Sequence, residues 1–248
     1  MTRSILITGA SAGIGAAVAR MAAARGYDVG IGFRSDTAGA EAVAADVEAA
    51  GGRAALLHGE VADPGALATV FAGHDASFGR LDALVNNAGI VDVAAQVEDI
   101  GADRLTRMFA TNITAAFLAA GHAVRRMGRH HGGAGGVIVN ISSKAALLAS
   151  ANQYVDYAAS KAALDVLTKG LSDEVAGQGI RVVGIRPGII DTALHVKGGE
   201  PDRADRLGPS VPMGRKGSAE EVAEAVLWAM SDAASYVTGT SFDVAGGR

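Results

Sequence analysis

Tyr157 and Lys161 stand four residues apart in an alanine-rich stretch that runs from Asp156 to Leu164. Because an α-helix turns once in about 3.6 residues, this spacing places the phenol and the ammonium on one helix face. A phenol with a pKa of about 10 is a poor base at neutral pH, and a nearby ammonium in a partly desolvated site lowers that pKa. The pair can therefore exchange a proton with a substrate oxygen. Taken alone, the same spacing is more often an ordinary pair on a helix surface.

A glycine-rich turn, Thr8-Gly-Ala-Ser-Ala-Gly-Ile-Gly15, follows the first apolar run of the chain. Glycines let the backbone turn tightly and approach a pyrophosphate, whose charge meets free N–H groups and the positive end of the next helix dipole. At a strand-to-helix junction that opens an alternating chain, this turn predicts nucleotide binding. The spacing G-x-x-x-G-x-G differs from the usual G-x-G-x-x-G, and no Gly-Lys-Ser/Thr follows, which excludes a Walker A loop.

The second predicted strand ends in Gly32-Phe-Arg-Ser35. An acidic side chain there would bond the ribose hydroxyls of NAD, whereas Arg34 offers two parallel N–H donors to the 2′-phosphate of NADP. The sequence therefore favours NADP(H) as the cofactor and leaves NAD(H) open. The alternative is that Arg34 is a solvated surface arginine.

These motifs need a scaffold that brings them together, and the rest of the chain predicts one. Short runs that are apolar throughout alternate with longer helical patterns, as a parallel sheet covered by helices on both faces requires. We expect a single doubly wound α/β domain over residues 1–248, with a seven-stranded parallel sheet. The expected strands are residues 4–8, 28–33, 53–57, 81–86, 136–142, 180–186 and 241–244, and the expected helices are residues 14–25, 37–50, 65–78, 102–128, 154–177 and 219–231.

The composition excludes several classes of function. The formal net charge is −4 and aromatic residues make up only 4% of the chain, so nucleic acid and anionic lipid are not expected partners. The absence of cysteine excludes disulfides and thiolate chemistry and fits the cytoplasm. The apolar stretches 4–19 and 108–124 are interrupted by glycines or polar residues, so we expect neither a signal peptide nor a membrane span. His130 and His131 lack a carboxylate at ligand spacing, and no metal site is expected.

Further motifs stand where predicted strands end, which is where an open α/β sheet places its ligand. They are Asn86-Asn-Ala-Gly89, Ser142-Ser143 and Arg186-Pro-Gly-Ile-Ile190, and a closing motif, Tyr236-Val-Thr-Gly-Thr240, precedes the last predicted strand. With the glycine turn and the Tyr157/Lys161 pair, in this order and spacing, the chain resembles the short-chain dehydrogenase/reductase (SDR) family over essentially its whole length. Within that family it is similar to members of the 3-oxoacyl-acyl-carrier-protein reductase and glucose 1-dehydrogenase types.

The resemblance implies a Rossmann-type fold and an NAD(P)(H)-dependent interconversion of a carbonyl and a secondary alcohol by hydride transfer. Tyr157 would be the general acid/base, and Lys161 would lower its pKa and hold the nicotinamide ribose. Ser143 would bond the carbonyl oxygen, and Asn112 would hold a water between Lys161 and solvent. The residues implied to bind the cofactor are Gly9, Ser11, Gly13, Ile14, Gly15, Arg34, Glu60, Val61, Asn87, Ala88, Gly89, Tyr157, Lys161, Pro187, Gly188, Ile190 and Thr192.

The chain departs from the family pattern at two positions. Glu60-Val61 stands where the family usually has Asp before an apolar residue, which puts the contact with the adenine amino group in doubt. Ala12 stands where NADP users often carry a basic residue, so Arg34 would bear the 2′-phosphate alone. The resemblance also implies a mobile substrate lid at residues 191–217 and a homotetramer built partly from the helix that carries Tyr157.

Two other functions remain as alternatives. The same acid/base residues serve an epimerase or dehydratase that holds its cofactor tightly. A dinucleotide sensor would keep the fold without turnover, but binding alone requires neither the serine nor the tyrosine of the predicted site. The identity of the small carbonyl or alcohol substrate stays open.

Overall fold

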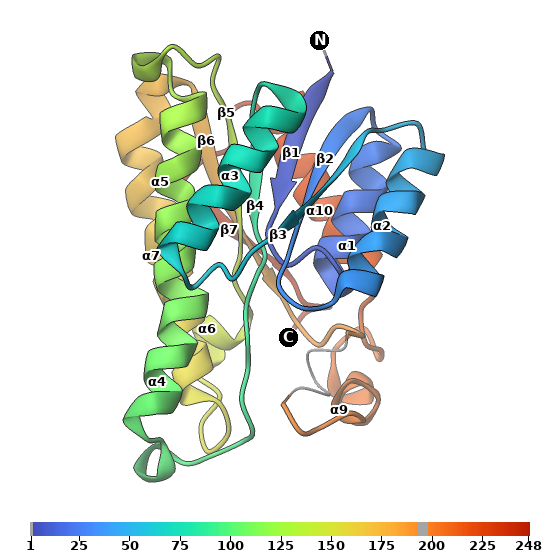
Figure 1. The fold of residues 1–248 in the computed structure, drawn as a ribbon. Coiled ribbons are helices and arrows are strands. Elements are labelled where there is room, and N and C mark those ends of the chain that lie inside the picture. Colours follow the sequence, from blue (N-terminus) through green and yellow to red (C-terminus); the bar gives the residue numbers. More distant parts are fainter. Residues whose placement is uncertain (1, 193–197) are drawn as a thin grey trace.

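The computed structural model describes residues 2–192 and 198–248, and its centre is a parallel sheet between two layers of helices (Figure 1). The strand order β3-β2-β1-β4-β5-β6-β7 confirms the predicted doubly wound, seven-stranded sheet, and the order reverses between β1 and β4. The strands are β1 (Arg3–Ile7), β2 (Tyr27–Phe33), β3 (Ala54–His58), β4 (Ala83–Asn86), β5 (Gly136–Ile141), β6 (Ile180–Pro187) and β7 (Thr240–Val244).

Alternate residues of each strand point to opposite faces of the sheet, and both faces are covered. In β1, Ile5 and Ile7 pack under one helical layer while Leu6 packs under the other, and all three are fully buried. One layer holds α1 (Gly13–Ala23), α2 (Thr37–Ala49) and α10 (Ala219–Met230), and the other holds α3 (Pro64–Phe78), α5 (Ala115–Met127) and α7 (Val155–Val175). This two-sided burial explains why the strands are apolar throughout.

At the starts of three helices, a side chain accepts a hydrogen bond from a backbone N–H that has no partner within the helix. Asp36 accepts from the backbone of α2, Asp63 does so for α3, and Ser218 forms a capping box with Glu221 at the start of α10. Within the described residues, α1 has neither a side-chain cap nor an acidic residue in its first turn. Its first N–H groups are therefore available to another acceptor.

The predicted helix over residues 102–128 is wrong as a single continuous element. The structure has α4 (Ala102–Phe109), a π-helical turn at Ala110–Thr114, and then α5. The helix widens where the buried amide of Asn112 bonds the backbone of Ile90. The spacing of apolar residues carries no information about this contact. Shorter elements that the sequence did not predict are α6 (Ala145–Leu148), α9 (Arg203–Leu207) and the single turns Val97–Asp99, Arg129–His131, Ala176–Gln178, Gly208–Ser210 and Asp232–Ala234.

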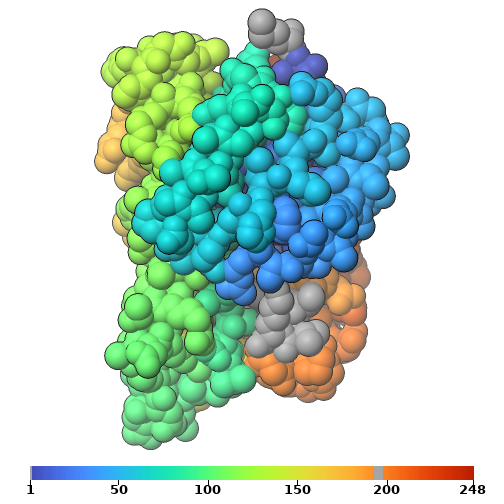
Figure 2. All heavy atoms as spheres, in the orientation of Figure 1, coloured from blue at the N-terminus to red at the C-terminus, as the bar shows by residue number. Residues whose placement is uncertain are grey.

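Of the expected lid, residues 191–217, residues 193–197 lie outside the described residues. The part from residue 198 onward contains α9, and Gly217 pairs with Ile190 as an isolated parallel bridge. In Figure 2 the lower end of the molecule is shared between the green segment around α4 and the orange segment around α9. No helix in the described part of the chain is long and apolar enough to cross a bilayer.

Candidate active site

A cavity of about 340 Å³ lies at the carboxyl ends of the strands, where the order of the sheet reverses. It extends from the glycine turn before α1 to the side chains of Tyr157 and Lys161 on α7. All the residues predicted to bind the cofactor line this cavity except Gly15. The sequence motifs, which are spread from residue 9 to residue 192, therefore meet in one place.

The glycine turn is built for close approach of another group. Gly9 and Gly13 have φ of +67° and +56°, a region that side-chain-bearing residues rarely adopt. A Cβ on Gly15 would lie 2.5 Å from the carbonyl oxygen of Gly9, so Gly15 packs behind the turn and does not line the cavity. Its contact with a cofactor stays a prediction. The open turn and the uncapped start of α1 fit a pyrophosphate.

Side-chain bonds hold the glycine turn against the end of β4. The hydroxyl of Thr8 accepts from the backbone N–H groups of Asn87 and Ala88, each at 3.0 Å. The amide of Asn87 donates to the carbonyl oxygens of Thr8 and Gly9 at 2.9 and 2.8 Å. Asn87 thus fixes one wall of the cavity through its side chain. Thr8 is a residue of this site that the sequence analysis did not name. Its position at the start of the glycine motif could have indicated its role.

A row of buried amides aligns the next two strands with α7. Asn86 of β4 donates to Asn140 of β5 at 2.9 Å, and Asn140 donates to the hydroxyl of Thr168 at 2.9 Å. All three residues are almost fully buried. Because an unpaired buried amide is costly, this chain of bonds fixes the position of α7 relative to the sheet.

Tyr157, Ser143 and Lys161 meet at the far end of the cavity from α1. Tyr157 is partly exposed and Lys161 is 3% exposed. The Nζ of Lys161 donates to the carbonyl oxygen of Ile141 at 2.8 Å and lies 5.7 Å from the centroid of the Tyr157 ring. Burial lowers the pKa of Lys161 to about 8. The helix spacing therefore does bring the ammonium beside the phenol, as the sequence predicts.

The expected lowering of the Tyr157 pKa is not produced by the protein's own groups. Burial raises the pKa of this phenol to about 12, and a hydrogen bond with Ser143 opposes the rise. The ammonium of Lys161 donates one hydrogen bond to the backbone of β5 and holds its positive charge 5.7 Å from the centroid of the Tyr157 ring. Lowering the pKa toward neutrality needs further positive charge beside the ring.

Ser142 and Ser143 have different environments. Ser142 is 2% exposed, and its hydroxyl donates to the carbonyl oxygen of Lys161 at 2.9 Å, which joins β5 to α7. Both serines line the cavity, but it is Ser143 that bonds Tyr157. The geometry therefore favours Ser143, as predicted, for contact with a substrate.

Asn112 lies behind the cavity wall, and Thr111 lines the cavity beside it. The Oδ1 of Asn112 accepts from the N–H of Ile90 at 2.8 Å, and its Nδ2 donates to the carbonyl oxygen of Ile90 at 2.9 Å and to Ser160 at 3.0 Å. A Cβ on Gly89 would lie 3.2 Å from the Nζ of Lys161 and 3.4 Å from the Oδ1 of Asn112. The visible role of Asn112 is to hold the loop after β4 close to Lys161.

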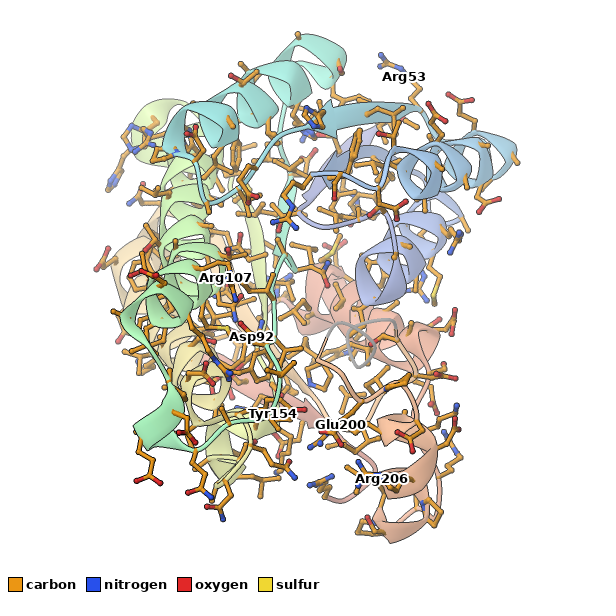
Figure 3. The ribbon with its side chains drawn as sticks, turned by 60° about the horizontal axis from the view of Figure 1, so that its bottom comes forward. Arg53, Asp92, Arg107, Tyr154, Glu200 and Arg206 are labelled. Carbon is orange, nitrogen blue, oxygen red and sulfur yellow. The ribbon has the colours of Figure 1, made fainter. Side chains whose placement is uncertain are left out.

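Two further cavity-lining residues, Tyr154 and Arg203, belong to a polar cluster to which the sequence analysis assigned no role. The hydroxyl of Tyr154 donates to Glu200 at 2.5 Å (Figure 3). Arg203 donates to Glu200 at 2.7 Å and to Gln153 at 2.9 Å. The guanidinium of Arg203 also lies over the Tyr154 ring, at 5.0 Å from its centroid. Arg206 adds a second ion pair to Glu200. This cluster, Gln153, Tyr154, Glu200, Arg203 and Arg206, joins the segment of α9 to the start of α7.

Two comparisons decide the family. A family model described as enoyl-(acyl carrier protein) reductase matches residues 9–248. The uncharacterized oxidoreductase YgfF of Escherichia coli strain K12 is 48% identical over 243 residues, which are 98% of this chain and 98% of that protein. The chain belongs to the short-chain dehydrogenase/reductase family. It is therefore a member of an oxidoreductase family.

Solved members of the SDR family share the whole fold. A short-chain dehydrogenase of Burkholderia cenocepacia in complex with NADP has a TM-score of 0.90 at 34% identity, covering 99% of this chain and 97% of that chain. A 3-ketoacyl-(acyl-carrier-protein) reductase of Brucella melitensis complexed with NADH has a TM-score of 0.90 at 30% identity, covering 99% and 98%.

Within this SDR chain, the cavity-lining residues that sequence reasoning missed fall into two groups. Tyr154 precedes Tyr157 by three residues, so helix spacing could have placed it on the same face. Arg203 had no such signal, because its segment shows no periodicity and contacts Tyr154 across 49 positions of sequence.

Proposed function

We propose that this chain is an NAD(P)(H)-dependent oxidoreductase that interconverts a carbonyl and a secondary alcohol, with Tyr157 as the general acid/base. The observation that carries the proposal is that Tyr157, Ser143 and Lys161 line the same cavity as the glycine turn before α1. The NADP and NADH complexes of the Burkholderia and Brucella relatives support a nicotinamide dinucleotide in that cavity.

The residues present fit such a cofactor. The open glycine turn and the uncapped start of α1 would hold the pyrophosphate, and the end of β2 would hold the adenosine. Pro187, Gly188 and Thr192 would line the nicotinamide end, and Lys161 would bond the ribose there. The nicotinamide supplies or accepts the hydride.

The chain's own groups manage the proton. In the reducing direction the hydroxyl of Tyr157 donates a proton to the substrate oxygen, and in the oxidising direction its phenolate accepts one. Ser143 donates a hydrogen bond to the same oxygen, which favours charge there as the carbonyl is reduced. The protonated Lys161 stabilises the phenolate, and a positively charged nicotinamide ring would add to that stabilisation. Asn112 holds the Ile90 loop in the position that keeps Gly89 against Lys161.

We favour NADP(H) over NAD(H) because Arg34 lines the adenosine end of the cavity. We also propose that the chain acts in the cytoplasm and that residues 191–217 form a lid over the substrate. The substrate is a small molecule with a carbonyl or secondary alcohol.

The decisive experiment replaces Tyr157 by Phe. We expect the variant to lose at least about 100-fold in carbonyl reduction, because the proton donor is gone. Binding of NADPH, followed by fluorescence, should stay within about twofold, because the ring and Lys161 remain. Tyr236→Phe, at a fully exposed tyrosine, is the matched control and should leave both quantities unchanged.

The assay offers NADPH and NADH separately with aldehydes, ketones, quinones, sugars and 3-oxoacyl thioesters. Stoichiometric oxidation of free NADPH with a ketone would exclude an epimerase or dehydratase that retains its cofactor. A wild-type protein that binds the dinucleotide and reduces none of these carbonyls would contradict the proposal and favour a sensor.

A further inference from the structure

The adenosine end of the cavity contains an ion pair between two neighbouring strand ends. Arg34 follows β2 and Glu60 follows β3, and the register pairs Phe33 with His58 at this edge. The Nη1 of Arg34 donates to the Oε2 of Glu60 at 2.9 Å. Both residues line the cavity. The guanidinium that is proposed to receive a 2′-phosphate thus already has a carboxylate partner.

The carboxylate of Glu60 is held in this position from its other side. Its Oε1 accepts from the N–H of Ala62 at 3.3 Å, so the two oxygens of one carboxylate bridge the backbone after β3 and the guanidinium of Arg34. Because glutamate is one methylene longer than aspartate, its carboxylate reaches farther from the β3 end. The sequence departure at this position therefore has a structural consequence, which is the contact with Arg34.

The charges around this end do not favour a dianion. Asp36 also lines the cavity, and its carboxylate caps α2 by accepting from Gly39 at 3.0 Å. The carboxylates of Glu60 and Asp36 therefore line this cavity together with Arg34. The side chains of Arg34 and Glu60 are 60% and 37% exposed, so water screens their attraction and the pair can open. When it opens toward a phosphate, the carboxylate of Glu60 stays nearby as a like charge.

We propose that Glu60 determines the cofactor specificity of this chain by competing with the 2′-phosphate of NADP(H) for Arg34. The competition weakens the binding of NADP(H) without affecting that of NAD(H), so the preference for NADP(H) that Arg34 provides is smaller than it would be without Glu60. This inference rests on the proposed function, because it assumes that a nicotinamide dinucleotide occupies the cavity. Glu60 acts here as a specificity residue and takes no part in the proton transfer.

Binding measurements test the competition without any turnover. Calorimetric titrations would compare NADPH with NADH, and the adenosine fragments 2′,5′-ADP with 5′-ADP. We expect Glu60→Gln to tighten both ligands that carry a 2′-phosphate by about fivefold, because the competing charge is removed. NADH and 5′-ADP should change by less than about twofold. Glu224→Gln, which removes the same charge from an exposed ion pair with Arg25, is the matched control and should change none of the four.

A double variant shows whether the effect passes through Arg34. Arg34→Ala should weaken the ligands with a 2′-phosphate, and in that background Glu60→Gln should give much less than its fivefold gain. An equal gain with and without Arg34 would mean that Glu60 acts only as a repelling charge, and it would overturn the competition. An unchanged NADPH to NADH ratio in Glu60→Gln would overturn the whole inference and leave the proposed function intact. A wild-type protein that binds none of the four ligands would contradict the proposed function itself.

Discussion

Lys161 shows why a residue's role is more than its position on a helix. The spacing from Tyr157 predicts that phenol and ammonium share a face, and they do, at 5.7 Å between Nζ and the ring centroid. The sequence could not predict that Nζ also donates to the carbonyl oxygen of Ile141, because that contact joins α7 to β5 across 20 positions. The pairing of Arg34 with Glu60 was hidden for the same reason, since it depends on the register of β2 against β3.

His74 on α3 gives a residue-scale prediction about stability. Its side chain is fully buried, its Nε2 lies 3.2 Å from both the hydroxyl of Ser4 and the carbonyl oxygen of Arg80, and burial lowers its pKa to about 4. In the unfolded chain a histidine pKa is about 6.5, so the unfolded chain binds more protons as the pH falls from about 6.5 toward 4. The stabilisation is therefore complete above pH 6.5 and is lost below it.

We expect this histidine to reduce the free energy of unfolding by about 2 kcal/mol between pH 7.5 and pH 5. Urea denaturation at the two pH values measures the change. His74→Asn, although less stable at both, should show a drop smaller by that amount, whereas His130→Asn, at an exposed position, should keep the full drop. Equal pH dependence in wild type and His74→Asn would contradict the prediction.

Helices and strands were predictable where the apolar residues repeat with one regular spacing along the whole element. All seven strands and the long helices α1, α2, α3, α7 and α10 fall within a few residues of their expected ranges, because apolar spacing and caps decide them locally. The break between α4 and α5 was not predictable, because the π-helical turn accompanies the hydrogen bonds between Asn112 and Ile90, which are 22 positions apart in the sequence. The α9 segment has no periodicity, and its position depends on polar contacts with Tyr154.

The bond between Tyr154 and Glu200 gives an element-scale prediction. Tyr154→Phe removes the hydrogen bond from the start of α7 to the α9 segment, and a bond to a charged group contributes about 1.5 kcal/mol. The segment should then open about tenfold more often, so trypsin should cleave after Arg203 and Arg206 about tenfold faster. Peptide mapping of a timed digest measures the two rates.

Tyr236→Phe is the control for this digest, because that tyrosine is fully exposed and should leave cleavage at the α9 segment unchanged. Cleavage in Tyr154→Phe at the wild-type rate would show that the ion pairs of Glu200 with Arg203 and Arg206 hold the segment without the tyrosine.

At the scale of the whole molecule, the sheet separates two apolar cores, and the site lies at the carboxyl ends of its strands. The cores form on opposite faces of the sheet, one under α1, α2 and α10 and the other under α3, α5 and α7. This division follows from strands buried on both faces, so the sequence predicts the site's location at the carboxyl ends of the strands. Leu164 and Leu167 of α7 are buried against Ala116 of α5.

The exposed apolar side chains of α5 and α7 offer a surface for the homotetramer that the family resemblance implies. Phe117 on α5 and Val166 on α7 are 49% and 72% exposed, and the two helices are neighbours (Figure 1). Multi-angle light scattering should give four times the mass of one 24.8 kDa chain. Val166→Glu would bury an unpaired charge between copies, so the mass should fall, whereas Ala38→Glu, on exposed α2, should preserve it. A wild-type protein with the mass of one chain, or a Val166→Glu variant that keeps the full mass, would show that these helices do not join copies of the chain.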